Sequence, residues 1–301
     1  MTIERFNNRD YVSITMEYRC NLRCTHCMIE GTMDRLRPES LQTYADLLAV
    51  NLRERRWKGL ILTGAEITLR RDLADLARRA RDSGFEHVRI QTHGAQLADE
   101  KFAAQLVAAG VDEYFVSVAG PDAATHDAIV RVPGAFDKMI AGMTWLDAQS
   151  GVALLTNTVV TSLSYRRLVD VVERLASLKR LRQMEFWVYW PMRESDEKQL
   201  IAPNSAVAPE LRAALGRAHA LGRATEVKNF PECLLGEHAG SLVNVQPHLY
   251  TDPAFWPEFM RNGFYQCVYR ERCASKECLG LSTAYVQRFG WDEKLLAPIH
   301  G

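Results

Sequence analysis

The chain has 301 residues, and its 37 Lys and Arg residues balance its 37 Asp and Glu residues. A chain of this length can bury a large core and has room for one α/β domain plus a small appendage. Because the charges balance, nothing favours nucleic acid as a partner. The N-terminal residues lack the apolar region of a signal peptide, and no apolar stretch approaches the roughly 20 residues that span a bilayer. We therefore expect a cytoplasmic protein with no membrane partner.

Short apolar runs alternate with segments of helical periodicity from Val12 to about Tyr189. We predict strands at residues 12–16, 60–64, 87–92, 113–118, 153–160 and 184–189. Amphipathic stretches between them predict helices at residues 71–84, 99–110 and 164–178. Gly84 and Gly110 suit the position just after a helix end.

Six β-α units with apolar strands indicate a parallel sheet covered by helices, in the α/β class. With six strands rather than eight, an incomplete barrel fits better than a closed one, although the pattern alone also allows a doubly wound sheet. In both cases ligands bind at the carboxyl ends of the strands.

The composition and the periodicity of the sequence change after Trp190. A stretch with proline and many charges, 190–209, leads to a helix predicted at 210–223, and the periodicity then fades. We therefore divide the chain into a barrel domain, residues 1–225, and a C-terminal extension, residues 226–301. A segment without regular elements folds poorly unless something cross-links it, and a bound metal does so.

The seven cysteines fall into two groups. Three stand near the start, Cys20, Cys24 and Cys27, in the run C-N-L-R-C-T-H-C. Four stand in the extension, Cys233, Cys267, Cys273 and Cys278. An odd number of cysteines in a cytosolic protein argues against a disulfide framework, and their clustering argues for metal.

The first group follows the first predicted strand, and its spacing suits either zinc or an iron–sulfur cluster. Structural zinc requires four ligands, for which His26 is the nearby fourth residue. A C-x3-C-x2-C triplet instead supplies three corners of a [4Fe–4S] cube and leaves one iron open to a substrate or cofactor. Structural zinc and unconnected core thiols remain the alternatives.

A C-x3-C-x2-C motif after the first strand of a β/α array resembles the radical S-adenosylmethionine (SAM) superfamily. The resemblance covers about residues 11–190. It implies a partial (β/α)6 barrel similar to the TIM barrel, a [4Fe–4S] cluster on the first three cysteines, and SAM bound at the open iron. It also implies an external reductant such as flavodoxin or ferredoxin, and a 5′-deoxyadenosyl radical that abstracts a hydrogen atom from the substrate.

Residues after the later strands match SAM-binding positions of this family. The resemblance implies such roles for Gly64, Glu66, Thr92, His93, Ser117, Arg131 and Asn157. Glu66 is the residue carried over as ligand of the methionine amino group, and a carboxylate facing an ammonium suits that role. The chain departs from the family at Ala65, where a second glycine is usual, and at Ala119, where an acid is usual.

Each of these residues also has a structural explanation when it is taken singly. Glu66 suits a helix cap, Ser117 and Asn157 suit strand ends or turns, and Arg131 suits a solvated surface charge. Their order along six β/α units, after the cysteine triplet, makes the combined match specific.

The second cysteine group resembles the auxiliary-cluster extension of the SPASM/twitch subgroup. Four cysteines suffice for one further, fully ligated [4Fe–4S] cluster, and zinc is the alternative. If one thiol were not a ligand, Cys233 would be the one, because it stands apart from the other three. It would then act catalytically, as a hydrogen-atom donor to the substrate radical.

The subgroup resemblance implies epimerisation or dehydrogenation of a small polar natural-product intermediate, such as a sugar, aminocyclitol or aminoglycoside in antibiotic biosynthesis. The first strand is expected by residue 12, which leaves no room before it for a leader-binding domain, and a single auxiliary site suits a compact pocket. The alternatives are a maturase that modifies a ribosomal peptide and a non-catalytic iron–sulfur electron carrier. The aromatic-rich stretch 249–267 either lines the pocket or, as is more usual, packs the extension onto the barrel.

Overall fold

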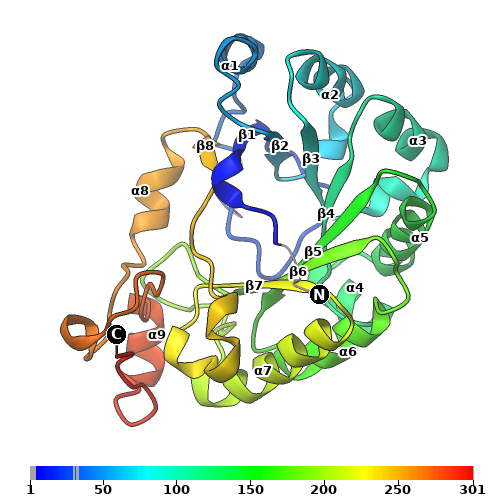
Figure 1. Ribbon diagram of the computed structural model, residues 1–301. Coiled ribbons are helices and arrows are strands. Elements are labelled where there is room, and N and C mark those ends of the chain that lie inside the picture. The colour runs from blue at the N-terminus through cyan, green and yellow to red at the C-terminus, as the bar shows by residue number, and fades with distance from the viewer. Residues whose placement is uncertain (1–4, 30, 32–33, 301) are drawn as a thin grey trace.

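A computed structural model of the protein describes residues 5–29, 31 and 34–300. Its strands form one parallel sheet in the order β7-β6-β5-β4-β3-β2-β1-β8. Their bounds are β1 Tyr11–Glu17, β2 Gly59–Gly64, β3 His87–Thr92, β4 Glu113–Ser117, β5 Ala153–Val160, β6 Leu181–Val188, β7 Ala224–Lys228 and β8 His248–Tyr250. The sheet curls without closing, and helices cover its outer face (Figure 1). The predicted partial barrel is therefore confirmed.

Helices follow most strands and return the chain to the start of the next one, as parallel pairing requires. Within the described residues the α-helices are α1 Leu41–Glu54, α2 Leu73–Asp82, α3 Glu100–Ala108, α4 Ala123–Val130, α5 Ala135–Asp147, α6 Leu168–Arg174, α7 Asn204–Ala220, α8 Phe255–Met260 and α9 Thr283–Phe289. Short 3-10 turns are η1 Asn8–Asp10, η2 Ile67–Leu69, η3 Ala95–Ala98, η4 Tyr165–Arg167, η5 Glu232–Leu234, η6 Gly236–Ser241 and η7 Arg270–Arg272. None of the helices in this part of the chain is long and apolar enough to cross a membrane.

The two helix ends predicted from glycine are confirmed. Gly84 and Gly110 come two residues after α2 and α3, with φ of 82° and 96°. Only glycine adopts this left-handed backbone without strain, so both positions terminate their helices cleanly.

The prediction that the extension lacks regular elements is wrong. β7 spans the predicted boundary between residues 225 and 226, and β8 pairs in parallel with β1. Both strands escaped the sequence pattern because β7 reads A-T-E-V-K, with charges at two of its five positions, and β8 has only three residues. The extension thus supplies the edge strand β8 and three of the five residues of β7 at the opposite edge.

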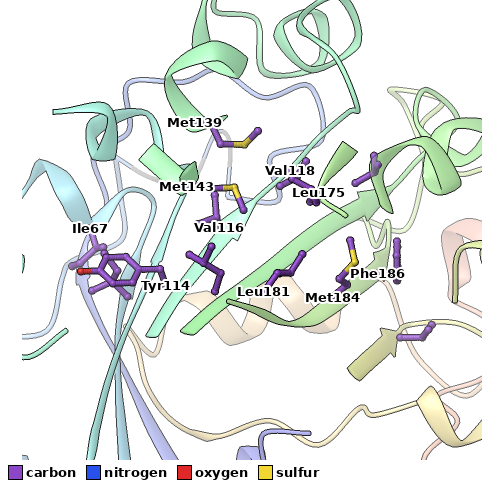
Figure 2. Packing of buried hydrophobic residues seen from close by; sticks show 14 of the residues in the cluster. Ile67, Tyr114, Val116, Val118, Met139, Met143, Leu175, Leu181, Met184 and Phe186 are labelled. Carbon is purple, nitrogen blue, oxygen red and sulfur yellow. The ribbon is translucent and has the colours of Figure 1, made fainter. Parts of the chain in front are cut away.

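Side chains on the outer face of the sheet form the main core with the helices. Figure 2 shows Val116 of β4 beside Met139 and Met143 of α5, and Tyr114 of β4 beside Ile67. Residues two apart on a strand share a face, so the alternate residues of the same strands point into the barrel. The outer core fixes the sheet and leaves the inner face for ligands.

Two buried tyrosines of this core provide a matched test of hydrogen bonding. The Tyr44 hydroxyl donates to the Leu76 carbonyl at 2.7 Å, whereas the Tyr114 hydroxyl is buried without a partner among the described residues. We expect Tyr44→Phe to lower the free energy of unfolding by about 1 kcal/mol, and Tyr114→Phe to leave it unchanged or raise it. Urea denaturation measures both, and equal losses would contradict the assignment.

Candidate active site

The loop after β1 places the first three cysteines around one cavity. This cavity has a volume of about 420 Å³ and lies at the carboxyl ends of the strands. Besides the three cysteines, its lining includes Gly64, Thr92, His93, Ser117, Arg131, Asn157 and Trp187. The structure thus brings together all the residues expected to contact the cluster or SAM except Glu66.

Backbone hydrogen bonds fasten the cysteine loop to the end of α4. The Arg23 N–H donates to the Val130 carbonyl at 3.1 Å, and the Thr25 N–H donates to the Ile129 carbonyl at 2.9 Å. Cys20 and Cys24 pack against a small apolar cluster made of Leu22, Ala119, Ile129, Val130 and Ala135. Ala119, which stands where relatives carry an acid, is therefore part of the apolar support of the loop.

Glu66 is fully buried and does not line the cavity. Its Oε1 accepts from the Thr68 N–H at 3.0 Å and from the Thr92 hydroxyl at 2.6 Å, and its Oε2 accepts from the His93 N–H at 2.8 Å. The carboxylate caps η2 and ties the end of β2 to the end of β3. Its implied contact with the SAM amino group stays a prediction.

Gly64 is required by close packing. A Cβ atom at this position would lie 1.9 Å from the Glu17 carbonyl oxygen, which also accepts a hydrogen bond from the Ala65 N–H at 2.8 Å. The end of β2 therefore lies directly against the end of β1, where the cysteine loop begins.

His93 links β3 to the cysteine loop. Its Nδ1 accepts from the Ala95 N–H at 3.2 Å, which assigns the ring proton to Nε2. Nε2 then donates to Asn21 Oδ1 at 2.7 Å. The role of Asn21, inside the cysteine motif itself, escaped the sequence analysis because nothing in the sequence marks it apart from its neighbours.

Two polar atoms in the cavity lining are buried without a hydrogen-bond partner in the described part of the chain. They are Asn157 Oδ1 on β5 and His26 Nδ1 in the cysteine loop. Buried polar atoms normally have partners, so an orphaned acceptor in a cavity wall points to a ligand. Burial lowers the pKa of His26 to about 4, which keeps its ring neutral.

Burial keeps Cys20 protonated as long as no metal is bound. Burial, more than the nearby charges of Glu66 and Cys27, raises the pKa of Cys20 to about 11. A metal must therefore displace the proton. No group of three or more His, Cys, Asp or Glu side chains among the described residues is spaced for a single metal ion. The fit to a [4Fe–4S] cluster and SAM rests on the three thiols and on a cavity within the usual size range of ligand sites.

A second cavity, of about 210 Å³, lies inside the barrel next to the first. The two share the lining residues Ile29, Gly64, Gln91, Phe115 and Trp187. Its other walls combine apolar residues with polar ones, which include Ser13, Thr15, Thr63, Arg89, Glu185 and Lys228. Sequence analysis missed this cavity, although polar residues at every second position of β3 and β6 are its signal.

The four cysteines of the extension gather in a separate place. Burial raises the pKa of Cys233, and Cys278, Cys267 and Cys273 lie close enough for their charges to raise it further. The Gly280 and Ile299 N–H groups donate to the sulfurs of Cys278 and Cys273, each at 3.4 Å. None of the four thiols lines either cavity.

The aromatic-rich stretch does both things that its sequence allows. Phe264 stacks on Trp190 with ring centroids 4.5 Å apart, which packs the extension onto the barrel. Leu249 and Phe255 line the second cavity.

Fold and site together define a partial β/α barrel that carries a cysteine triplet at the carboxyl ends of its strands. Residues 14–175, just over half of the chain, match the family described as the radical SAM superfamily. The chain therefore belongs to the radical SAM superfamily, as its cysteine motif predicted.

Two relatives illustrate the sequence similarity. The chain is 32% identical over 162 residues to an AdoMet-dependent heme synthase of Nitratidesulfovibrio vulgaris, covering 53% of this chain and 43% of that protein. It is 32% identical over 173 residues to a probable GTP 3′,8-cyclase of Methanopyrus kandleri, covering 57% of this chain and 53% of that one. The chain spans about half the length of the curated relatives it matches.

Solved structures share the fold. SuiB of Streptococcus suis bound to its precursor peptide SuiA gives a TM-score of 0.59 at 16% identity, covering 72% of this chain and 48% of that chain. The enzyme anSMEcpe with bound AdoMet gives 0.57 at 16% identity, covering 72% and 63%. At these identities the likeness concerns the fold alone.

The Glu66 contacts predict a structural cost. Glu66→Gln would turn an amide N–H group toward hydrogen-bond donors, so we expect the free energy of unfolding to fall by about 2 kcal/mol. Urea denaturation measures the change. Glu173→Gln, at an exposed carboxylate paired with Arg217, is the control and should leave stability unaltered. A Glu66→Gln protein as stable as the parent would contradict this account.

His126 predicts a loss of stability in acid. Burial lowers its pKa to about 4, against a weaker opposing effect of Asp127, and its Nδ1 accepts from the Ala119 N–H at 3.2 Å. The unfolded chain, with a pKa near 6.5, then takes up the proton first, so the His126 contribution is complete above about pH 6.5 and is lost toward pH 4.

Unfolding measured at pH 7.5 and pH 5 tests this point. The parent protein should lose about 2 kcal/mol more than His126→Gln between these two pH values. An equal pH dependence of both proteins would contradict a neutral buried His126.

Proposed function

We propose that the protein is a radical SAM enzyme that oxidises or epimerises a small polar molecule of the sugar, aminocyclitol or aminoglycoside class, as in antibiotic biosynthesis. One observation carries the proposal: a cavity inside the barrel, with charged and hydroxyl-bearing residues in its wall, adjoins the cavity that the three cysteines line. We place the enzyme in the cytoplasm, with flavodoxin or ferredoxin as its reductant.

The first cavity would hold both the cluster and SAM. Cys20, Cys24 and Cys27 would hold a [4Fe–4S] cluster with one iron open to SAM. When bound and reduced, these cofactors supply a 5′-deoxyadenosyl radical that removes a hydrogen atom from the substrate. Asn157 Oδ1, buried without a partner in the described part of the chain, would accept a hydrogen bond from SAM.

Two aromatic residues stand between the cavities. Phe115 and Trp187 line both, and their ring centroids lie 6.2 Å apart. Their bulk would exclude water from the place where the hydrogen atom leaves the substrate and would limit which hydrogen comes within reach.

In the extension, Cys233, Cys267, Cys273 and Cys278 would hold the auxiliary [4Fe–4S] cluster of a twitch-like protein. Cys233 lies within electrostatic range of the other three thiols and lines neither cavity, which supports a ligand role over hydrogen donation. Without a thiol beside the substrate, oxidation is favoured over epimerisation. The substrate carbon would lose the hydrogen atom and then, with release of a proton, an electron, for which the auxiliary [4Fe–4S] cluster would be the acceptor.

A peptide substrate has less support. The likeness to SuiB, solved with its precursor peptide, concerns the fold alone. The inner cavity of about 210 Å³ suits a small molecule better than a peptide segment.

Anaerobic reconstitution followed by dithionite and SAM tests the radical chemistry. We expect about eight irons per chain and formation of 5′-deoxyadenosine. A chain that retains its irons and yields no 5′-deoxyadenosine would overturn the proposal in favour of an electron carrier.

Paired cysteine variants separate the two sites. Cys20→Ala should lose about four irons and all 5′-deoxyadenosine, whereas Cys233→Ala should lose about four irons from the other cluster and keep SAM cleavage. A Cys233→Ala protein that keeps about eight irons but gives a different product would identify Cys233 as the hydrogen donor. In D₂O, deuterium at a product carbon would then report epimerisation.

A further inference from the structure

The buried charges on the inner face of the barrel do not balance. Strands β3 to β7 carry five buried ionisable side chains that share the inward-facing parity: Arg89, Glu113, Glu185, Glu226 and Lys228. Three are carboxylates and two are cations, so the fully ionised set carries one net negative charge. Burying an unpaired charge costs free energy, so the groups around each of these side chains show which charge lacks a partner.

The first pair satisfies the carboxylate but not the guanidinium, because Arg89 Nη2, in the wall of the same cavity, is buried without a hydrogen-bond partner among the described residues. Arg89 Nε donates to Glu113 Oε2 at 2.7 Å, and the two side chains are 3% and 2% exposed. The Tyr11 hydroxyl donates to the other oxygen of Glu113, also at 2.7 Å. Glu113 therefore needs no further partner.

The second pair joins Glu226 to Lys228, and each of these charges has a partner. Lys228 Nζ lies 3.2 Å from Glu226 Oε2, and Lys228 also donates to the Val243 carbonyl at 2.8 Å. Burial and the nearby charge of Glu185 raise the pKa of Glu226 to about 7, so this carboxylate is ionised fully only in mildly alkaline solution.

Glu185 is the carboxylate left over. Its two oxygens accept from neutral donors, Gln183 Nε2 at 2.9 Å and Trp187 Nε1 at 2.7 Å. No salt bridge joins it to a cation in the described part of the chain, although Arg89 in the same cavity wall lies within electrostatic range of it. Glu185 is 4% exposed. A buried carboxylate in this setting calls for a positive charge in the cavity.

The other polar residues in the wall of the second cavity indicate which further groups the ligand carries. Ser13, Thr15 and Thr63 present hydroxyl groups, and Gln91 presents an amide whose Oε1 accepts from Thr63 Oγ1 at 2.5 Å. Hydroxyls and amides both donate and accept, so they pair well with the hydroxyl groups of a ligand.

We propose that the second cavity binds a polyhydroxylated amine and that Glu185 recognises its ammonium group. This assignment rests on the proposed function, because the cavity adjoins the one in which the hydrogen atom would be abstracted. A polyanion such as a nucleoside triphosphate would bring further negative charge to a site that already has an excess, so it should be rejected.

Calorimetric titration of the reconstituted protein with SAM and without reductant tests the assignment at pH 8. The probes are 2-deoxystreptamine, which carries two amines, myo-inositol, which carries none, and GTP. We expect 2-deoxystreptamine to bind at least about tenfold more tightly than myo-inositol, with GTP weakest. Tighter binding of myo-inositol or GTP, or no binding of any probe at millimolar concentration, would overturn the proposal.

Glu185→Gln keeps the shape of the side chain and removes its charge. We expect it to weaken 2-deoxystreptamine binding about tenfold or more and to leave myo-inositol binding unchanged. Glu173→Gln, outside the barrel, is the matched control and should bind as the parent does. An unchanged affinity of Glu185→Gln for 2-deoxystreptamine would refute the role of Glu185.

SAM cleavage separates this test from that of the proposed function. Parent and Glu173→Gln proteins should form the same amount of 5′-deoxyadenosine with dithionite in the absence of substrate. If both do so while the binding data fail, only the substrate assignment falls; if neither does, the proposed function falls.

Discussion

All the described strands run in the same direction, and the rest of the molecule depends on this constraint. Parallel pairing forces each connection to return along the outside, so helices take the outer face and every strand ends at one edge. The cysteine loop follows β1, Thr92 and Ser117 end β3 and β4, and Asn157 lies within β5; the shared strand direction brings them to one cavity. Distant segments of the sequence thus become one site without long loops.

The alternation of side chains then divides the molecule into two chemical environments. The outer face packs mostly Leu, Ile, Val and aromatic residues against the helices. The inner face carries hydroxyls, amides and charges beside apolar residues such as Phe115 and Trp187. A parallel sheet with both faces covered usually has apolar residues on both. Here the polar groups on the inner face lower the stability of the fold, and proteins retain such groups where ligands bind.

Sequence analysis predicted the sheet well where strands are long and apolar. The predicted bounds of β3 and β5 agree with the observed ones. β7 and β8 could not be found in the same way, since their pairing with β6 and β1 rather than their own composition makes them strands.

The site divides along similar lines. The spacing of Cys20, Cys24 and Cys27 identifies them as ligands, because ligands that are close in the sequence form a recognisable motif. Glu66 shows the limit of a motif: its place in the sequence matches the family, yet the carboxylate lies behind the cavity wall and holds Thr92 and His93 in place. The charge imbalance around Glu185 could not be predicted from the sequence for another reason, since it depends on which buried charged groups form pairs in the folded protein.

The pairing of β8 with β1 has a consequence for how the chain comes together. Val12, Ser13 and Ile14 in the first strand pair with His248, Leu249 and Tyr250. A ribosome makes β1 first, so its outer edge stays without a strand until some 230 later residues have been added. An exposed parallel edge invites pairing with other chains. The cysteine-rich extension therefore covers the edge of β1 as well as carrying four thiols.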